Sequence, residues 1–99
     1  MSEVNQARAL LWRSLLYVPA NVERFIDRAH IRGADGIILD LEDSVPSSEK
    51  AAARDGLASS VARVGQAGAD VLVRVNRPLE LAVPDIEAAV AAGVRGLFL

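Results

Sequence analysis

The chain has 99 residues, of which 52% are hydrophobic and 24% are charged, and its formal net charge is −2. This balance is typical of a globular chain that buries a core, and it provides no basic stripe for nucleic acid. With no cysteine and one histidine, His30, disulfides, thiolate chemistry and a zinc cluster are excluded, so any metal needs oxygen ligands. There is no apolar run near the roughly 20 residues of a membrane span and no secretion signal, so we expect a cytoplasmic protein without membrane partners.

Four short, dense apolar runs are spaced along the chain, as expected of strands that are buried on both faces of a parallel sheet. They are Leu15 to Val18, Gly36 to Leu41, Val71 to Val75, and Gly96 to Leu99. Between them lie three helical patterns, each with a capping residue or proline before an apolar stripe and a glycine after it. The expected helices run from Asn21 to Gly33, from Ser47 to Gly65, and from Pro84-Asp85 to Gly93.

Repeated strand and helix units with short connections predict a parallel sheet with right-handed crossovers. An open doubly wound sheet and a closed barrel both fit this order, but no Gly-x-Gly-x-x-Gly loop follows the first strand, which favours the barrel. A (β/α)8 TIM barrel takes about 250 residues. We therefore interpret residues 13–99 as the first four strands and three helices of such an α/β barrel, stopping within the fourth strand, after a polar tail at 1–12. A small free-standing α/β domain is the alternative. Open strand edges predict a marginal or self-associating polypeptide.

Charged residues occur where the second and third strands end. Asp40 and Glu42 alternate with apolar residues and so share one face, and Arg74 and Asn76 do the same on the next strand. In TIM barrels the active site lies at the carboxyl ends of the strands. Two readings stay open: the carboxylates pair with Arg74 or cap the following loop, or the cluster binds a cation and a substrate carboxylate.

Two pairs of basic residues are spaced four apart on the expected helices. From spacing alone, Arg24 and Arg28 are best read as a solvated face paired with Glu23 and Asp27. Their place just after the first strand also suits phosphate binding at the rim of the barrel. For Lys50 and Arg54 on the second helix, the solvated-face interpretation is stronger. We treat His30 as structural.

Three motifs in order resemble the citrate lyase β-subunit and malyl-CoA lyase family, also described as HpcH/HpaI aldolase/citrate lyase. The first is Arg13 to Asn21 (RSLLYVPAN) with Glu23-Arg24-Phe25, the second is Ile38 to Val45 (ILDLEDSV) with Lys50 and Arg54 after it, and the third is Val73 to Asn76 (VRVN). The resemblance extends from Arg13 to Leu99. It implies a Mg²⁺-dependent barrel enzyme, usually a homo-oligomer, that makes or breaks a carbon–carbon bond in 3-hydroxyacyl-CoA thioesters of the citryl, malyl or citramalyl type.

The resemblance also implies roles for individual residues. Arg74 matches the catalytic arginine that holds the carboxylate of the 2-oxo acid, and Asn76 belongs to the same substrate-binding motif. Tyr17, Arg24 and Arg28 match positions that contact the acyl-CoA thioester, the arginines through phosphates of coenzyme A.

For the metal, the resemblance places Asp40, Glu42 and Asp43 beside Mg²⁺, as outer-shell groups that act through water. The direct ligands of the family, a glutamate and an aspartate, are expected beyond Leu99, so the 99 residues alone are expected to be inactive.

The sequence departs from the family pattern at Ala20, where many relatives have glycine, and at Arg77-Pro78, where a small residue commonly follows the asparagine. Arg77 either adds a contact to the acid or blocks the usual one. Two other functions stay open: a non-catalytic partial barrel that acts as a subunit or assembly module, and a 2-oxo-acid aldolase that does not use coenzyme A.

Overall fold

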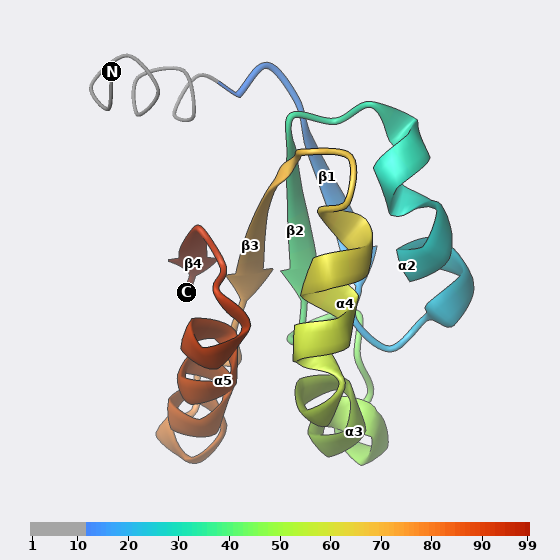
Figure 1. Ribbon diagram of the computed structural model, residues 1–99. Helices are drawn as coiled ribbons and strands as arrows, with labels where there is room; N and C mark the ends of the chain where they lie inside the picture. The colour runs from blue at the N-terminus through green and yellow to red at the C-terminus, as the bar shows by residue number, and fades with distance from the viewer. Residues whose placement is uncertain (1–11) are drawn as a thin grey trace.

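A computed structural model describes residues 12–99 of the chain, which form a four-stranded parallel sheet with helices on one side (Figure 1). The strands are β1 (Leu15–Pro19), β2 (Gly36–Asp40), β3 (Asp70–Arg74) and β4 (Gly96–Phe98), and each pairs with the next one in the chain. The register places Pro19 beside Asp40, and Asp40 beside Arg74. The predicted parallel α/β sheet is confirmed, as the opening part of a TIM-barrel-like fold, and three strand ends meet at one edge.

The helical segments connect successive strands and pack against the same face of the sheet (Figure 1). They are α2 (Glu23–Arg28), the 3-10 turn η1 (Ala29–Arg32), the 3-10 turn η2 (Ser47–Glu49), α3 (Lys50–Asp55), α4 (Leu57–Val64) and α5 (Leu79–Ala92). Alternate residues of each strand, such as Val18, Leu39 and Val73, pack against this helical layer in the main core. The other residues of the strands, including Tyr17, Asp40 and Arg74, face the opposite side.

The first two helices begin or continue differently from the sequence prediction. Asn21 is not the cap of the first helix: Val22 occupies that position, and the Asn21 amide donates a hydrogen bond to Glu49 instead (2.7 Å). The second helix is interrupted at Gly56, which separates α3 from α4, because glycine stabilises a helix interior less than any residue except proline. Ser47 also makes no capping hydrogen bond.

The third helix starts earlier than predicted, at Leu79, so that Pro84 lies inside α5 rather than before it. An interior proline removes the hydrogen bond to the carbonyl four residues earlier, here that of Glu80. Glu80 is exposed in the first turn, where water can bind the freed carbonyl, so the helix continues through Pro84. The predicted stops are correct: Gly33 and Gly93 follow η1 and α5 with φ angles of 76° and 77°, a conformation that favours glycine.

The amino-terminal ends of the strands are tied to the residues just before β1. The Trp12 indole donates a hydrogen bond to the Asp70 carboxylate (2.6 Å), and Arg13 pairs with Asp35 (3.1 Å). The predicted polar tail at 1–12 lies outside the described residues, except for Trp12. Across residues 12–99, none of the helices is both long and apolar enough to cross a membrane.

Candidate functional site

The centre of the candidate site is an ion pair between the last residues of β2 and β3. The Arg74 guanidinium donates two parallel hydrogen bonds to the Asp40 carboxylate, from Nε at 2.9 Å and from Nη2 at 2.8 Å. The parallel register sets Asp40 directly opposite Arg74, so the pair follows from strand pairing alone. This forked geometry fixes the plane of the guanidinium more strictly than a single contact to lysine would.

Asp40 is the most heavily bonded carboxylate of the site. Besides Arg74, it accepts hydrogen bonds from the backbone N–H of Glu42 and from both the N–H and the hydroxyl of Ser44. Burial alone would raise the pKa of Asp40, but these bonds outweigh burial and hold the pKa well below its usual range. The hydrogen bond to Asp40 also raises the pKa of Arg74. Asp40 is therefore an anchor for Arg74 that is ionised at neutral pH.

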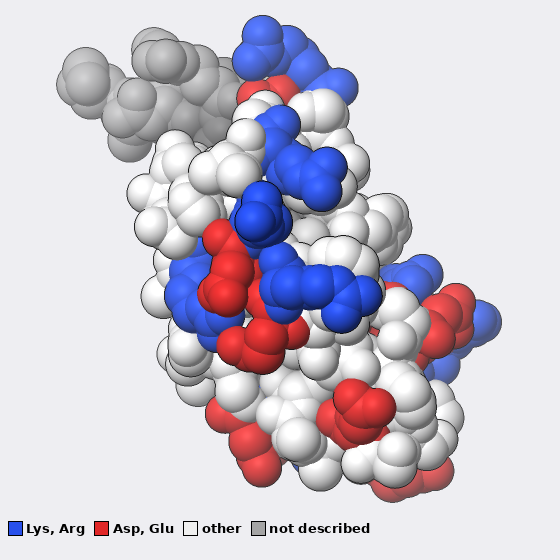
Figure 2. Space-filling view, turned by 90° about the vertical axis from the view of Figure 1, so that its right-hand side faces the viewer, with Lys and Arg blue, Asp and Glu red and all other residues white. Residues whose placement is uncertain are grey.

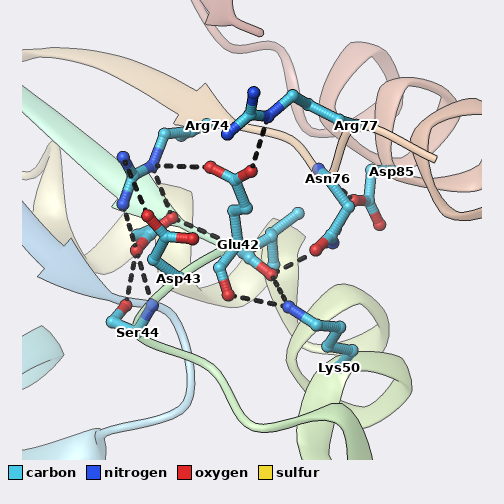
Figure 3. Close-up of polar contacts among 10 residues, drawn as sticks. Glu42, Asp43, Ser44, Lys50, Arg74, Asn76, Arg77 and Asp85 are labelled. Carbon is cyan, nitrogen blue, oxygen red and sulfur yellow. Dashed lines mark hydrogen bonds and ion pairs between the residues drawn. The ribbon is translucent and has the colours of Figure 1, made fainter.

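Two more carboxylates and a second guanidinium lie around the pair at the same rim, those of Glu42, Asp43 and Arg77 (Figure 3). The Glu42 carboxylate lies 3.6 Å from Nε of Arg74 and 3.2 Å from Nε of Arg77, while Asp43 lies 3.9 Å from Arg74. On the other side, the Arg74 guanidinium lies over the Tyr17 ring, 5.3 Å from its centroid. Asp40, Glu42 and Arg74 thus converge at one edge, in the arrangement that the strand pattern predicts.

A buried polar network supports this rim from the helical side. Asp85 of α5, which is 1% exposed, accepts hydrogen bonds from the backbone and side-chain nitrogens of Asn76 (3.0 and 2.7 Å) and from Arg54 (2.9 Å). The Asn76 amide also donates to the Leu41 carbonyl (3.1 Å), and Lys50 donates to the carbonyls of Leu41 and Glu42. The network therefore fixes the backbone that carries Glu42.

This network corrects two sequence interpretations. Lys50 and Arg54 do not form a solvated pair, because both side chains reach inward, to backbone carbonyls and to Asp85 respectively. Asn76 does not share the face of Arg74: β3 ends at Arg74, and the Asn76 side chain turns toward α5. Sequence reasoning treated Asp85 only as part of a helix start. The available signal was that Asp85 lies inside an apolar stretch, three residues before Ala88-Ala89, which indicates a buried side chain.

A second group of predicted residues lines a cavity beside the free edge of β1. Tyr17 and the first-helix arginines Arg24 and Arg28 contribute to its wall, together with Phe25 and Arg32, and the cavity measures about 320 Å³. Figure 2 shows Lys and Arg side chains gathered along one face of the molecule, with a group of Asp and Glu side chains against it.

The predicted pairing of Arg24 and Arg28 with Glu23 and Asp27 is wrong. Both carboxylates bind Arg63 of α4 instead, which leaves the arginines beside the cavity. Arg24 lies over the Phe25 ring, 4.7 Å from its centroid.

A larger cavity, of about 850 Å³, opens at the opposite end of the sheet between α4 and α5. Its wall includes Asp70 and Arg95, at the amino-terminal ends of β3 and β4. In barrels of this kind the amino-terminal end carries stability rather than chemistry, so we place the candidate site at the carboxyl-terminal rim.

The described residues do not fit direct binding of a metal ion. Across residues 12–99, no three acidic or histidine side chains are grouped so that they surround a common point. Both oxygens of Asp40 are occupied by hydrogen-bond donors, and Glu42 lies between two guanidinium groups. These carboxylates are placed to accept hydrogen bonds from protein donors and not to ligate a metal ion directly.

Comparison with known protein families gives a match. The model of the HpcH/HpaI aldolase/citrate lyase family matches residues 13–99. The chain belongs to this family. The family is described by its aldolases and citrate lyases, and its match includes the rim of Asp40 and Arg74.

The regions of this chain that match curated relatives cover most of its length. A (3S)-malyl-CoA thioesterase of Cereibacter sphaeroides (strain ATCC 17025) is 42% identical over 65 residues, which are 66% of this chain and 23% of the relative. Citrate lyase subunit beta of Leuconostoc mesenteroides subsp. cremoris is 36% identical over 88 residues, 85% of this chain and 28% of the relative. The same subunit of Escherichia coli (strain K12) is 32% identical over 93 residues, 93% and 31% respectively. The chain thus spans less than a third of the length of each of these relatives.

Proposed function

We propose that the whole protein to which this chain belongs is a carbon–carbon lyase or synthase. It acts on 3-hydroxyacyl-CoA thioesters of the citryl, malyl or citramalyl type and gives an acyl-CoA and a 2-oxo acid. The observation that carries this proposal is the Arg74 guanidinium at the strand ends, which donates two parallel hydrogen bonds to Asp40 and lies over the Tyr17 ring. Family membership and the names of the relatives support the same substrate class.

Arg74 has donors left for a ligand after its bonds to Asp40. A guanidinium carries five N–H groups, of which Nε and one of Nη2 point to Asp40. The side chain is 25% exposed, so the remaining donors reach the rim. In this proposal they grip the carboxylate of the 2-oxo acid, and the fixed plane of the guanidinium orients the adjacent oxo group for bond formation or cleavage.

The reaction balances without an oxidant or a reductant. In cleavage, the hydroxyl proton leaves, the carbon–oxygen bond becomes the carbonyl of the 2-oxo acid, and the electron pair of the broken carbon–carbon bond passes to the thioester as an enolate. Protonation of that enolate gives the acyl-CoA. Synthesis is the reverse path. Arg74 acts throughout by holding the acid end of the substrate.

The cavity beside β1 is the proposed site for the thioester arm. Arg24 and Arg28 supply cationic groups that match coenzyme A phosphates, and Tyr17 links this cavity to the ion pair, because it lines the one and contacts the other. Dependence on Mg²⁺, a homo-oligomeric state and a cytoplasmic location are further parts of the proposal. The direct metal ligands would come from residues other than those described, with Asp40, Glu42 and Asp43 in contact through water.

The test is an assay of the protein at the length of its relatives, with citryl-, malyl- and citramalyl-CoA and Mg²⁺. Formation of the 2-oxo acid and release of free coenzyme A are measured separately. We expect 2-oxo acid from the wild type and a loss of about 100-fold or more in kcat/KM for Arg74→Lys, because lysine cannot make the paired hydrogen bonds. Arg95→Gln removes an exposed arginine at the other end of the sheet and is the matched control.

The same assay separates the competing functions. Release of coenzyme A without 2-oxo acid would assign a thioesterase, the function that names one group of relatives. A double variant, Arg24→Ala with Arg28→Ala, is expected to raise KM for the thioester; unchanged KM together with activity on free hydroxy acids would instead indicate an aldolase without coenzyme A. Absence of turnover with every substrate would favour the non-catalytic assembly module.

A further inference from the structure

The side chain of Arg77 is the second guanidinium at the rim, three residues after Arg74. Figure 3 shows the Glu42 carboxylate between the two guanidinium groups, with Arg77 approaching from the side of β3 and α5. Nε of Arg77 lies 3.2 Å from one oxygen of Glu42, and Nε of Arg74 lies 3.6 Å from the other. One carboxylate therefore lies between two cationic groups at the carboxyl-terminal rim.

Arg77 makes fewer protein contacts than Arg74. Its side chain is 79% exposed, against 25% for Arg74, and within residues 12–99 its guanidinium makes one hydrogen bond, to Glu42. Four of its five N–H donors remain for a ligand. Because the group is already in water, binding an anion there does not require the rearrangement of a buried pair.

We propose that Arg77 is a specificity-determining residue that selects 2-oxo acids bearing a second carboxylate. This inference rests on the proposed function, in which Arg74 holds the carboxylate next to the oxo group. The distal carboxylate of a dicarboxylic 2-oxo acid then pairs with Arg77, which lies beside Arg74 because Glu42 contacts both guanidinium groups.

The carboxylates at the rim make a second cation necessary for such a substrate. Glu42 and Asp43 are both acidic and both lie within 4.0 Å of arginine nitrogens, so a second substrate carboxylate arriving without a cation would meet two like charges. Arg77 offsets this repulsion. A monocarboxylic 2-oxo acid places no charge there and gains nothing from Arg77.

A simpler role for Arg77 would be to hold Glu42 in place. That role predicts an equal effect on every 2-oxo acid, because Glu42 would shift whichever acid is bound. A specificity role predicts a loss for dicarboxylic acids alone. The two roles are therefore distinguished by a ratio of rates, which does not depend on overall activity or on folding yield.

The experiment compares oxaloacetate with glyoxylate and pyruvate as co-substrates of acetyl-CoA or propionyl-CoA, in the protein at the length of its relatives. We expect Arg77→Gln to lower kcat/KM for oxaloacetate by about 10-fold or more and to change the other two by less than about threefold, since a charge-assisted hydrogen bond of this kind is worth a factor of ten or more. Arg77→Lys is expected to restore part of the preference. Arg95→Gln, with the same loss of charge at the other end of the sheet, should leave the ratio unchanged.

Calorimetric titration of the three acids without acyl-CoA gives a second readout. If no substrate is turned over, the lyase proposal fails, but tighter binding of oxaloacetate that is lost in Arg77→Gln would still support the role of Arg77. Equal losses for all three acids, or no loss for oxaloacetate, would overturn it.

Discussion

Both ends of the sheet carry an arginine paired with an aspartate, yet the two pairs differ in burial and in the number of partners. At the carboxyl end, the Asp40 side chain is 3% exposed and accepts five hydrogen bonds, two of them from Arg74. At the amino end, Arg13 is 89% exposed where it meets Asp35. An ion pair of the same kind is therefore a fixed support at the carboxyl end of the sheet and a solvated contact at the amino end.

The difference shows where the fold places polar groups in its interior. Burying a carboxylate is costly unless its lone pairs are satisfied, and such groups persist where they position something else. At the carboxyl end, Asp40 positions Arg74, and the network of Asp85 and Asn76 positions the backbone that carries Glu42. The contacts at the amino end hold only the segment that precedes β1.

The largest effect is expected from removing the centre of the buried network. Asp85→Ala leaves the Arg54 cation and two Asn76 nitrogens without their acceptor, at a cost of about 3 to 5 kcal/mol in the free energy of unfolding. Urea unfolding followed by circular dichroism measures this cost. Glu87→Ala, an exposed residue on the same helix, is the control and should change stability by less than about 0.5 kcal/mol. Equal effects of the two variants would mean that the network is not stabilising.

The next effect separates Asp40 from its exposed neighbour Asp43. Because the pKa of Asp40 is lowered in the folded protein, its contribution is complete above the unfolded value of about 3.9 and is lost as pH falls below about 4. Asp40→Asn should cost about 2 to 3 kcal/mol at pH 7, and its deficit relative to the wild type should shrink between pH 4 and pH 2. The measurement is urea unfolding at several pH values.

Asp43 supplies the matched control for this variant. Its side chain is 74% exposed and lies 3.9 Å from Arg74, so Asp43→Asn should leave both the stability at pH 7 and its acid dependence close to those of the wild type. If Asp43→Asn reproduced the acid profile of Asp40→Asn, the ion pair with Arg74 would not be the source of the pH dependence.

The sequence predicts the strands and the convergence of Asp40, Glu42 and Arg74 because both depend on local patterns. Dense apolar runs locate the strands, and the alternation of side chains puts residues two apart on one face. In a parallel sheet without insertions, equal lengths from strand start to strand end then bring Asp40 and Arg74 together. The positions of Asp40 and Arg74 thus follow from a pattern visible within six residues of each.

The helix boundaries and the supporting network depend on distant contacts and could not be predicted in the same way. Pro84 looks like a helix start, but it lies inside α5, where the residue one turn earlier, Glu80, is exposed to water. Lys50 and Arg54 look like a solvated pair, yet their partners are the backbone after β2 and a carboxylate 31 residues away. A spacing of four residues along a helix is the same for a solvated pair and for two side chains that reach inward, so it does not distinguish them.

The smallest effects are expected at the amino end, where a comparison of Trp12 with Arg13 tests the role of burial directly. Trp12→Phe keeps the aromatic ring but removes the hydrogen bond to Asp70, which is partly buried, and should lower the free energy of unfolding by about 1 kcal/mol. Arg13→Ala removes a contact of a side chain that is 89% exposed, and water replaces it, so no measurable change is expected. Urea unfolding of the two variants in parallel provides the measurement. A larger loss for Arg13→Ala than for Trp12→Phe would show that the exposed pair, and not the indole, holds this end of the sheet.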